Sequence, residues 1–458
     1  MAASPVDMAR RRRSEVDFIP FDDPRQAAWT LLAIRFAIDG QRTLHFWQGE
    51  FHRFDGAAYT RMPKADVRAT LYSIGGLPNG KPLKREHIEN VLDALRAAAN
   101  YSNTRSMPSW ILAEDDDPDP RSLILLRNGM LDPVTRILRP PSPRLFAANA
   151  LPFQYEPRAP HPRSWLQFLG DLWDDDVESV LLLQEWIGYL LTSRTEQQKA
   201  LLLVGPKRGG KGTIGRVIGR LLGAHNMVSP TLASLGTQFG LQPLIGRLLA
   251  LISDARLGSR ADAALMAENV LRVTGEDQIS IPRKFMEDFT CTLPTRLMLL
   301  TNELPRFTDA SGALPSRFLV LQTTKSWFGR EDVVLDRRLE AELPSILNWS
   351  LDGLERLTER GRFVQPASAL QAIAEMEALA SPVGAFVADA CNVGPQYEEP
   401  VKAVYDAWRQ WCEEGGREHP GTEQTFGRDL KAAVPGLVVR QPRRDGDRVR
   451  VYQGIGLK

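Results

Sequence analysis

The stretch that most constrains the fold of this 458-residue chain is an apolar run that breaks into a glycine-rich loop. Residues 201–204 read Leu-Leu-Leu-Val, and the following loop reaches a lysine, Lys211, where a helix should begin. Glycines let successive backbone N–H groups point into one concavity, and a helix N-terminus adds its positive end, so such loops bind phosphates. The order of strand, loop and helix therefore predicts a nucleotide-phosphate site on a sheet of an α/β protein.

The loop follows the spacing of the P-loop, in which the lysine reaches the β- and γ-phosphates. We expect its residues to bind the nucleotide: Gly205, Pro206, Lys207, Arg208, Gly209, Gly210, Lys211, Gly212 and Thr213. One position departs from that pattern, because Gly212 stands where a hydroxyl would hold Mg²⁺, and the hydroxyl follows one residue later at Thr213. Some nucleotide kinases share this ending, so the loop alone does not select one class of enzyme.

The composition limits the class of protein to which the chain can belong. A hydrophobic content of 43% and a charged content of 25% are ordinary for a globular protein, and the length suggests about two to four domains. The net charge of +1 predicts no global attraction to nucleic acid, so such binding must come from local patches. The three cysteines are scattered, and the most apolar run, 180–191, is interrupted and short for a bilayer. We expect a cytoplasmic protein with no membrane partner.

Further short apolar runs follow the loop, and each ends in polar residues. The runs at 247–253, 296–301 and 317–322 resemble strands that are covered on both faces of a parallel sheet. Ligands of such sheets bind beyond the carboxyl ends of the strands. Asp254 and Asn302 come directly after two of these runs. We expect Asp254 to help hold Mg²⁺ and Asn302 to orient an attacking water near the γ-phosphate.

Changes of pattern along the chain divide it into five segments. Charged residues and prolines indicate a flexible tail at the start of the chain. Apolar and polar residues nearly alternate around 43–56, which indicates a β-meander, and the proline-rich stretch 140–162 indicates a connection between domains. The C-terminal order of helix, turn, helix and basic hairpin is that of a winged helix-turn-helix. We expect a tail at 1–25, an α+β domain at 26–150, a helical collar at 151–195, a parallel-sheet ATPase domain at 196–365 and a winged helix at 366–458.

Four motifs together resemble those of superfamily III helicases, in the helicase part of phage and plasmid primase proteins. Gly-Pro-Lys-Arg-Gly-Gly-Lys-Gly-Thr, Ile-Ser-Asp-Ala-Arg, Thr-Gly-Glu-Asp-Gln-Ile-Ser-Ile-Pro-Arg-Lys and Leu-Thr-Asn-Glu-Leu-Pro stand in the order of motifs A, B, B′ and C. Ser-Gly-Ala-Leu-Pro-Ser-Arg-Phe follows where that family places its arginine finger. The resemblance covers about residues 40–458 and is closest to the satellite-phage replication type.

This resemblance implies a ring of AAA+ type, a homohexamer with ATP and Mg²⁺ bound between subunits and single-stranded DNA in the central channel. Lys211 and Thr213 would belong to the phosphate loop, with Thr213 and Asp254 at the metal and Asn302 as the sensor. Arg317 would reach the γ-phosphate held by a neighbouring subunit. The family's channel hairpin would place two cations on the DNA backbone, Arg283 and Lys284.

The resemblance also suggests partners. Arginines of the proposed wing, among them Arg443, Arg444 and Arg448, would run along the phosphates of an origin duplex. The first 150 residues show no pair of acids spaced like a primase site, so we expect no primer synthesis by this chain, and whether a separate primase is a partner stays open. The setting implied is replication of a phage or mobile element in the cytoplasm of a bacterial host.

Two departures from the family's motifs, Gly212 in motif A and Ala255 in motif B, keep other functions open. Ala255 follows Asp254 where the family has a second acid, so the catalytic base is unassigned among Glu268, Glu276 and Asp277. The leading hypothesis is an ATP-driven DNA helicase or translocase. The first alternative is a DNA-binding replication initiator that ATP controls with little turnover. The second is a nucleotide kinase, which the Gly-Lys-Gly-Thr ending alone would allow.

Overall fold

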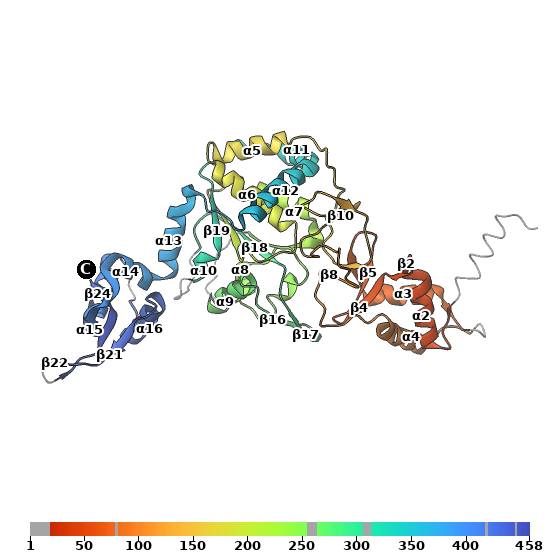
Figure 1. Ribbon diagram of the computed structural model, residues 1–458, viewed down its shortest axis with the longest axis horizontal. Coiled ribbons are helices and arrows are strands. Elements are labelled where there is room, and N and C mark those ends of the chain that lie inside the picture. The colour runs from red at the N-terminus through yellow and green to blue at the C-terminus, as the bar shows by residue number, and fades with distance from the viewer. Residues whose placement is uncertain (1–18, 78–80, 254–262, 306–312, 417–419, 445–446) are drawn as a thin grey trace, which may run out of the picture.

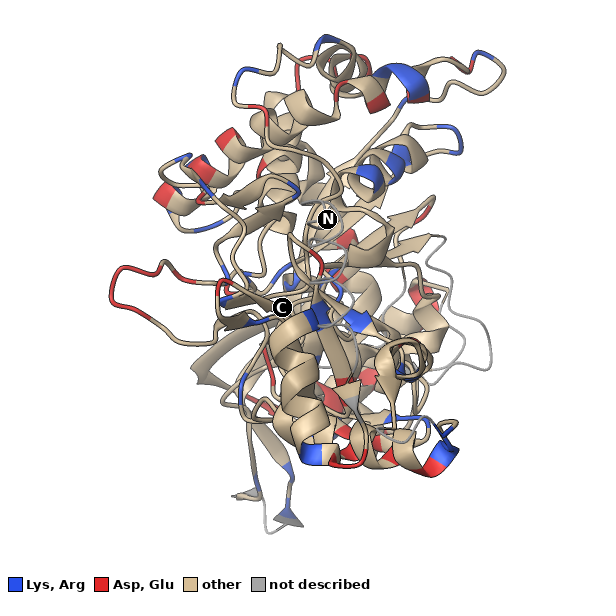
Figure 2. Ribbon diagram, turned by 90° about the vertical axis from the view of Figure 1, so that its right-hand side faces the viewer, with Lys and Arg blue, Asp and Glu red and all other residues tan. Residues whose placement is uncertain are grey.

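The computed structural model describes residues 19–77, 81–253, 263–305, 313–416, 420–444 and 447–458. The protein is of mixed α/β type, with a central parallel sheet flanked along the longest axis by an N-terminal and a C-terminal part (Figure 1). Basic and acidic residues are interspersed along the ribbon in the side view (Figure 2), in accord with the net charge of +1. None of the helices in these ranges is long and apolar enough to span a bilayer.

The N-terminal part contains the predicted meander and helices. Strands β4 (Leu44–Trp47), β5 (Glu50–Phe54) and β6 (Tyr59–Met62) pair antiparallel, beside helices α2 (Pro24–Arg35), α3 (Lys64–Ile74) and α4 (Arg85–Ala98). Helix α4 buries Ile88, Val91, Leu92 and Leu95, whose spacing places them on one face.

The predicted tail is too long at its C-terminal end. Strand β1 (Ile19–Pro20) pairs with β7 (Gly75–Gly76), and Ile19 and Phe21 are almost completely buried in the core of α2 and α4. Two large apolar side chains outweigh the charged and proline-rich residues around them, because their burial stabilises the fold. The domain therefore includes residues 19–25.

Short strands connect this domain to the collar helices α5 (Arg163–Trp173) and α6 (Val177–Leu190). These strands are β8 (Ser109–Trp110), β9 (Ile124–Leu126), β10 (Gly129–Leu131), β11 (Leu138–Arg139) and β12 (Leu145–Phe146). Helix α6 packs along α12 (Leu343–Arg360), where buried Glu185 accepts hydrogen bonds from Arg356 and Arg360. The collar shares one hydrophobic core with the sheet, so it forms a layer of the central domain.

The central sheet confirms the predicted parallel arrangement. Its strands are β13 (Ala200–Val204), β14 (Met227–Val228), β15 (Leu249–Ser253), β18 (Arg296–Thr301) and β19 (Phe318–Gln322). They lie in the order β14-β15-β18-β13-β19, and every pair is parallel. Side chains of β13 alternate between two cores, with Leu201 and Leu203 toward α6 and α12 and Leu202 toward the opposite face. Burial on both faces accounts for the continuous apolar runs.

Helices cover both faces of this sheet. Helix α7 (Lys211–Leu222) joins the collar helices, and α11 (Leu335–Ala341) lies against α5 and α7. The opposite face is covered by α8 (Leu232–Leu235), α9 (Ala263–Thr274) and α10 (Ala313–Ser316). The β16 (Ile279–Arg283) and β17 (Met286–Cys291) hairpin projects from it.

A buried arginine ties the collar to the sheet. Arg296, at the start of β18, is 3% exposed and donates to the backbone oxygens of Leu190, Thr192, Arg194 and Pro294 at 2.6–3.2 Å. These bonds satisfy carbonyls beyond the end of α6, which would otherwise be buried without partners. Burial lowers the pKa of Arg296 to about 10, so its guanidinium stays charged at neutral pH.

The C-terminal part has the predicted helices and strands. Helices α14 (Pro382–Ala390), α15 (Val401–Glu414) and α16 (Glu423–Ala433) pack beside strands β20 (Cys391–Pro400), β21 (Val438–Arg440) and β24 (Val451–Leu457). Its core includes stacked Trp408 and Phe426, as expected for a structural aromatic set. Helix α13 (Leu370–Ala380) instead buries Ala372 and Met376 in the core of the central sheet. The separate core therefore begins near residue 383, beyond the predicted boundary at 366.

The meander buries two histidines that oppose each other across β4 and β5. His45 is 4% exposed, and neither of its ring nitrogens has a hydrogen-bond partner among the described residues; the Nδ1 of His52 is likewise unpaired. Aromatic rings of Tyr59, Tyr101 and Phe146 surround His45. Burial, aided by nearby arginines, lowers the pKa of both histidines to about 4. Both imidazoles are therefore neutral in the folded protein at pH 7.

This pair predicts acid destabilisation of the N-terminal part. In the unfolded chain the pKa of each histidine lies near 6.5, so between about pH 6.5 and 4 the unfolded state binds more protons and stability falls as pH falls. At pH 5 each histidine should lower the free energy of unfolding by up to about 2 kcal/mol relative to pH 7. Urea unfolding at the two pH values should show a smaller difference for His45→Phe than for the wild type. An unchanged difference would contradict this assignment.

Candidate nucleotide-binding site

The glycine-rich loop lies at the carboxyl edge of the sheet, as predicted. Strand β13 ends at Val204, and helix α7 begins at Lys211. Gly210 caps the helix with φ +78°, a left-handed conformation that glycine adopts without strain. The backbone turns over six residues and places the helix N-terminus beside the end of β13.

The ammonium of Lys211 is the centre of the loop. Its Nζ donates to the carbonyl oxygens of Gly205 and Pro206 at 2.6 and 2.7 Å, and to Oδ1 of Asn302 at 3.0 Å. Lys211 is 9% exposed, and burial lowers its pKa. The predicted lysine and the predicted sensor therefore meet at one point, because β18 is the direct neighbour of β13 and both strands end there.

The segment that follows β19 forms the wall of the loop. The hydroxyl of Thr323 is buried without a hydrogen-bond partner among the described residues, and it lies against Gly205 and Gly209. A Cβ added at Gly205 would stand 2.0 Å from this hydroxyl and 2.4 Å from the Thr323 carbonyl oxygen. Only glycine fits at Gly205, because Thr323 packs directly against the loop backbone there.

Charged pairs border the first turn of α7. Arg216 donates to the hydroxyl of Thr213 at 3.1 Å and to the carboxylate of Asp336 on α11 at 2.9 Å. Arg208 of the loop pairs with Glu331 at 3.3 Å. The sequence did not predict that these acidic partners and Thr323 would lie beside the loop. The apolar run of β19 ends in Gln322 and Thr323, which is the same signal that marked the other strand ends.

Among the predicted metal ligands, Thr213 lies in the first turn of α7, within the described ranges. Asp254 lies outside them; the residue before it, Ser253, ends β15. Strand β18 separates β15 from β13, so the ends of the three strands share one edge. Within the described ranges, no group of three or more His, Cys, Asp or Glu side chains could hold a metal ion. The Mg²⁺ assignment to Thr213 and Asp254 stays a prediction.

Arg317 lies directly before strand β19, at the end of the sheet where the parallel strands begin. The glycine-rich loop lies at the other end, where the strands finish. The carbonyl of Arg317 accepts a hydrogen bond from the first residue of β13, Ala200, at 2.8 Å. Its guanidinium donates to Oε1 of Gln198 at 2.7 Å. The length of β13 separates the two edges by roughly 15 Å. Arg317 therefore cannot reach the loop of its own chain.

Two of the three candidate bases are placed by their contacts. Glu276 accepts a hydrogen bond from Thr195 at 2.6 Å, and Thr195 precedes β13, so Glu276 belongs to the same edge as Arg317. The exposed side chain of Glu268 pairs with Arg272 one turn later in α9. The structure assigns neither of them to the loop, and among the described residues Asp277 makes no hydrogen bond or ion pair with it.

The predicted DNA-binding hairpin is partly occupied by internal contacts. Arg283 donates to the carbonyl of Gln48 at 3.1 Å and to that of Glu287 at 2.8 Å, and it lies over the ring of Phe289. Lys284 is exposed, with its ammonium over the ring of Phe239. The tip residue Phe285 is fully exposed at φ +62°, an uncommon conformation for an aromatic residue. The hairpin therefore offers Lys284 and Phe285 to a partner more readily than Arg283.

The predicted wing is a two-stranded ribbon. Strand β22 (Arg443–Arg444) pairs antiparallel with β23 (Asp447–Arg448), and Arg443 is opposite Arg448. Arg448 is exposed. The ribbon extends from the C-terminal part away from the central sheet (Figure 1).

Two protein families match separate parts of the chain. The first is a family of unknown function (DUF5906), which matches residues 203–317 and so spans the loop, β15, β18 and Arg317. The second, described as D5 N terminal like, matches residues 79–174, from α4 to the collar. Both are typical of phage and plasmid primase-helicase proteins.

Solved structures resemble the chain at the level of the fold. The apo structure of the NrS-1 C-terminal region shares 14% identity, covers 95% of this chain and 100% of its own, and has a TM-score of 0.51. An A-form apo structure of the same region shares 13% identity, with 90% and 97% covered and a TM-score of 0.48. At this identity, the first of these shows a shared fold and nothing more.

A matched pair of glycine substitutions tests the loop geometry. Gly205→Ala should lower the free energy of unfolding by about 1–3 kcal/mol and weaken ATP binding, because its methyl group collides with Thr323. Gly212→Ala should be tolerated, since the nearest atom to its Cβ is the flexible Arg216 Nη1 at 3.4 Å. Thermal unfolding and calorimetric ATP titration measure both effects. Equal effects of the two substitutions would contradict the described geometry.

Proposed function

We propose that the protein is an ATP-dependent DNA helicase or translocase that acts in the replication of a phage or mobile element. The observation that carries this proposal is the contact of Lys211 with Asn302 at the carboxyl edge of a parallel sheet. A phosphate-binding lysine and a polar group for the attacking water are the two parts that phosphoryl transfer from ATP needs at one point. Glycine-rich loops that lead into a helix, as this one does, bind phosphate groups, which supports the proposal.

The lysine supports nucleotide binding through an exchange of partners. Its ammonium donates hydrogen bonds to the Gly205 and Pro206 carbonyls. The β- and γ-phosphates would replace these oxygens, which favours a charged ammonium in a buried position. Asn302, already oriented by Lys211, would then position a water for attack. When bound, Mg²⁺ would neutralise charge on the phosphates, and Thr213 and Asp254 are the residues proposed to hold it.

The site is proposed to be completed by a second copy of the chain. Arg317 faces away from its own loop, so it can stabilise transition-state charge only on a nucleotide held by a neighbour. A closed ring gives every copy such a neighbour, and we propose a homohexamer. Single-stranded DNA would pass through the ring beside the β16–β17 hairpin, where exposed Lys284 could contact phosphates without reading sequence.

The flanking parts support a role in replication. The D5 N terminal like match and the fold shared with the NrS-1 C-terminal region are the basis for placing the chain among phage replication proteins. The C-terminal part, with its basic ribbon β22–β23, is proposed to act as a winged helix on origin duplex through Arg443, Arg444 and Arg448. A separate primase would supply primers in the cytoplasm of the host.

A DNA-binding initiator with little turnover is the second candidate. Within the described residues, no carboxylate contacts Lys211, and Ala255 takes the place of a second acid in the sequence. An ATPase without a base to activate water would bind ATP and turn it over slowly. Such a protein would assemble on DNA with ATP and would not translocate.

Steady-state ATP hydrolysis with and without single-stranded DNA separates the two candidates. We expect the wild type to hydrolyse ATP faster with DNA, because a motor couples turnover to its track. Lys211→Ala should abolish hydrolysis through lost phosphate binding. Arg317→Ala should lower kcat by about 10³-fold or more while ATP still binds.

The control for Arg317 is Arg85→Ala on α4, whose side chain is 85% exposed and which should leave hydrolysis unchanged. Tight ATP binding without turnover in the wild type would contradict the motor and favour the initiator. Full activity of Lys211→Ala would contradict the assignment of the loop.

A further inference from the structure

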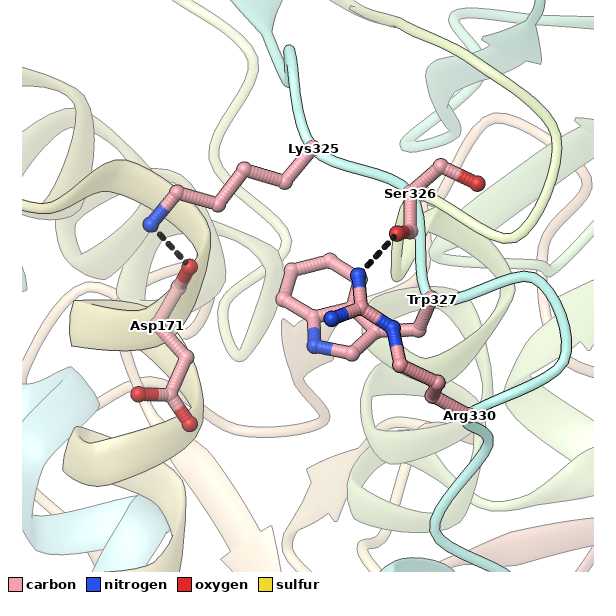
Figure 3. A pocket seen from close by; sticks show the side chains of 5 residues that line it. All are labelled: Asp171, Lys325, Ser326, Trp327 and Arg330. Atoms are coloured by element: carbon pink, nitrogen blue, oxygen red, sulfur yellow. Dashed lines mark hydrogen bonds between the residues drawn. The ribbon is translucent and has the colours of Figure 1, made fainter.

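A cavity of about 480 Å³ opens beside the glycine-rich loop, and neither Lys211 nor Asn302 is among its lining residues. Its walls are the loop with the first turn of α7, helix α5, and the segment from Trp327 to Arg338. A second hollow of about 550 Å³ adjoins it and shares Asp171 and Trp327 (Figure 3). Cavities of this size bind small molecules. Resting on the proposed function, we infer that the first cavity receives the nucleoside part of ATP, with Trp327 contacting the base and Asp171 the ribose.

The position of the cavity follows from the two sides of the loop. On one side, Lys211 is almost buried and directed toward Asn302, which leaves that side to the terminal phosphates. On the other side, Gly210, Gly212 and Thr213 line the cavity directly. A triphosphate bound in the loop must carry its nucleoside out through the open side. That side leads into this cavity.

The charge of the lining favours a neutral group there. Arg208 pairs with Glu331, Arg216 with Asp336, and Arg338 with Asp332. Each guanidinium in the wall thus has a carboxylate partner, so the cavity is a poor site for a further phosphate. A base and a ribose carry no charge and do not need a free cation.

Two aromatic residues provide apolar walls. Phe168 on α5 is 8% exposed and packs under Gly210, while Trp327 is half-buried on the opposite wall. The Trp327 N–H of the backbone donates to the carbonyl of Arg208 at 3.1 Å, which couples this residue to the loop. Val333, at the mouth, is 90% exposed. Exposed apolar side chains around a cavity indicate a surface that a flat apolar ligand can cover.

Asp171 is the acceptor suited to the ribose. Its Oδ1 accepts a hydrogen bond from Nε2 of Gln167 at 2.8 Å, and Lys325 donates to its carbonyl at 2.9 Å (Figure 3). The bond from Gln167 orients the carboxylate and leaves its second oxygen for a hydroxyl group, while the bond from Lys325 holds the backbone of Asp171. Acidic side chains bind the ribose hydroxyls of nucleotides in this way.

Comparing ATP with inorganic tripolyphosphate tests the inference. Tripolyphosphate presents the phosphates without a nucleoside, so it should bind the loop whatever happens in the cavity. Trp327→Ala should weaken ATP binding about tenfold or more and leave tripolyphosphate binding unchanged. Asp171→Asn should likewise weaken ATP alone. The matched control is Phe328→Ala, an exposed neighbour that lines neither hollow.

Each outcome of these calorimetric titrations decides the matter. Unchanged ATP binding by Trp327→Ala, in a variant with wild-type circular dichroism, would overturn the inference. Equal loss of ATP and tripolyphosphate would also overturn it, because the cavity would then only support the loop. If the wild type binds neither compound, the proposed function fails as well. If it binds tripolyphosphate as tightly as ATP, the loop stands and the nucleoside cavity does not.

Discussion

The parallel direction of all five central strands is the constraint on which the site depends. It gathers the ends of β13, β15 and β18 at one edge, where Lys211 meets Asn302. It also sends the starts of the same strands to the other edge, where Arg317 and Arg296 lie. The lysine proposed to bind phosphate and the arginine proposed to stabilise charge are therefore separated within one chain. This separation is the reason for proposing that a second copy of the chain completes the site.

The parts on either side of the sheet are attached by different contacts. The N-terminal part meets the β16–β17 hairpin through the Arg283 bond to Gln48 and the packing of Trp47 on Phe289. A movement of the hairpin would therefore be transmitted to the meander. The C-terminal part is joined through α13, which packs in the core of the sheet, while its own core begins near residue 383.

The sequence was sufficient for features that depend on local pattern. Continuous apolar runs predicted β13, β15, β18 and β19 because both faces of these strands are buried, and the glycine spacing located the loop. The partners of that loop could not be predicted, because Thr323 and Asp336 reach it only through the order of strands and the packing of α11. The predicted end of the flexible tail at residue 25 was wrong, because the apolar side chains of Ile19 and Phe21 are buried although the residues near them are charged. The position of Arg317 was within reach of the sequence, because the run at 317–322 placed it at the start of a parallel strand, and the parallel pairing of β19 with β13 puts that start opposite the loop.

The central claim is that one active site is built from two copies of the chain. Mixing Lys211→Ala with Arg317→Ala tests it most directly, since each variant alone lacks one half of every site. In mixed rings, an intact Lys211 of one subunit faces an intact Arg317 of its neighbour. Hydrolysis of ATP should therefore reappear in the mixture, at a fraction of the wild-type rate. A mixture as inactive as its two components, under conditions where they assemble together, would contradict the account.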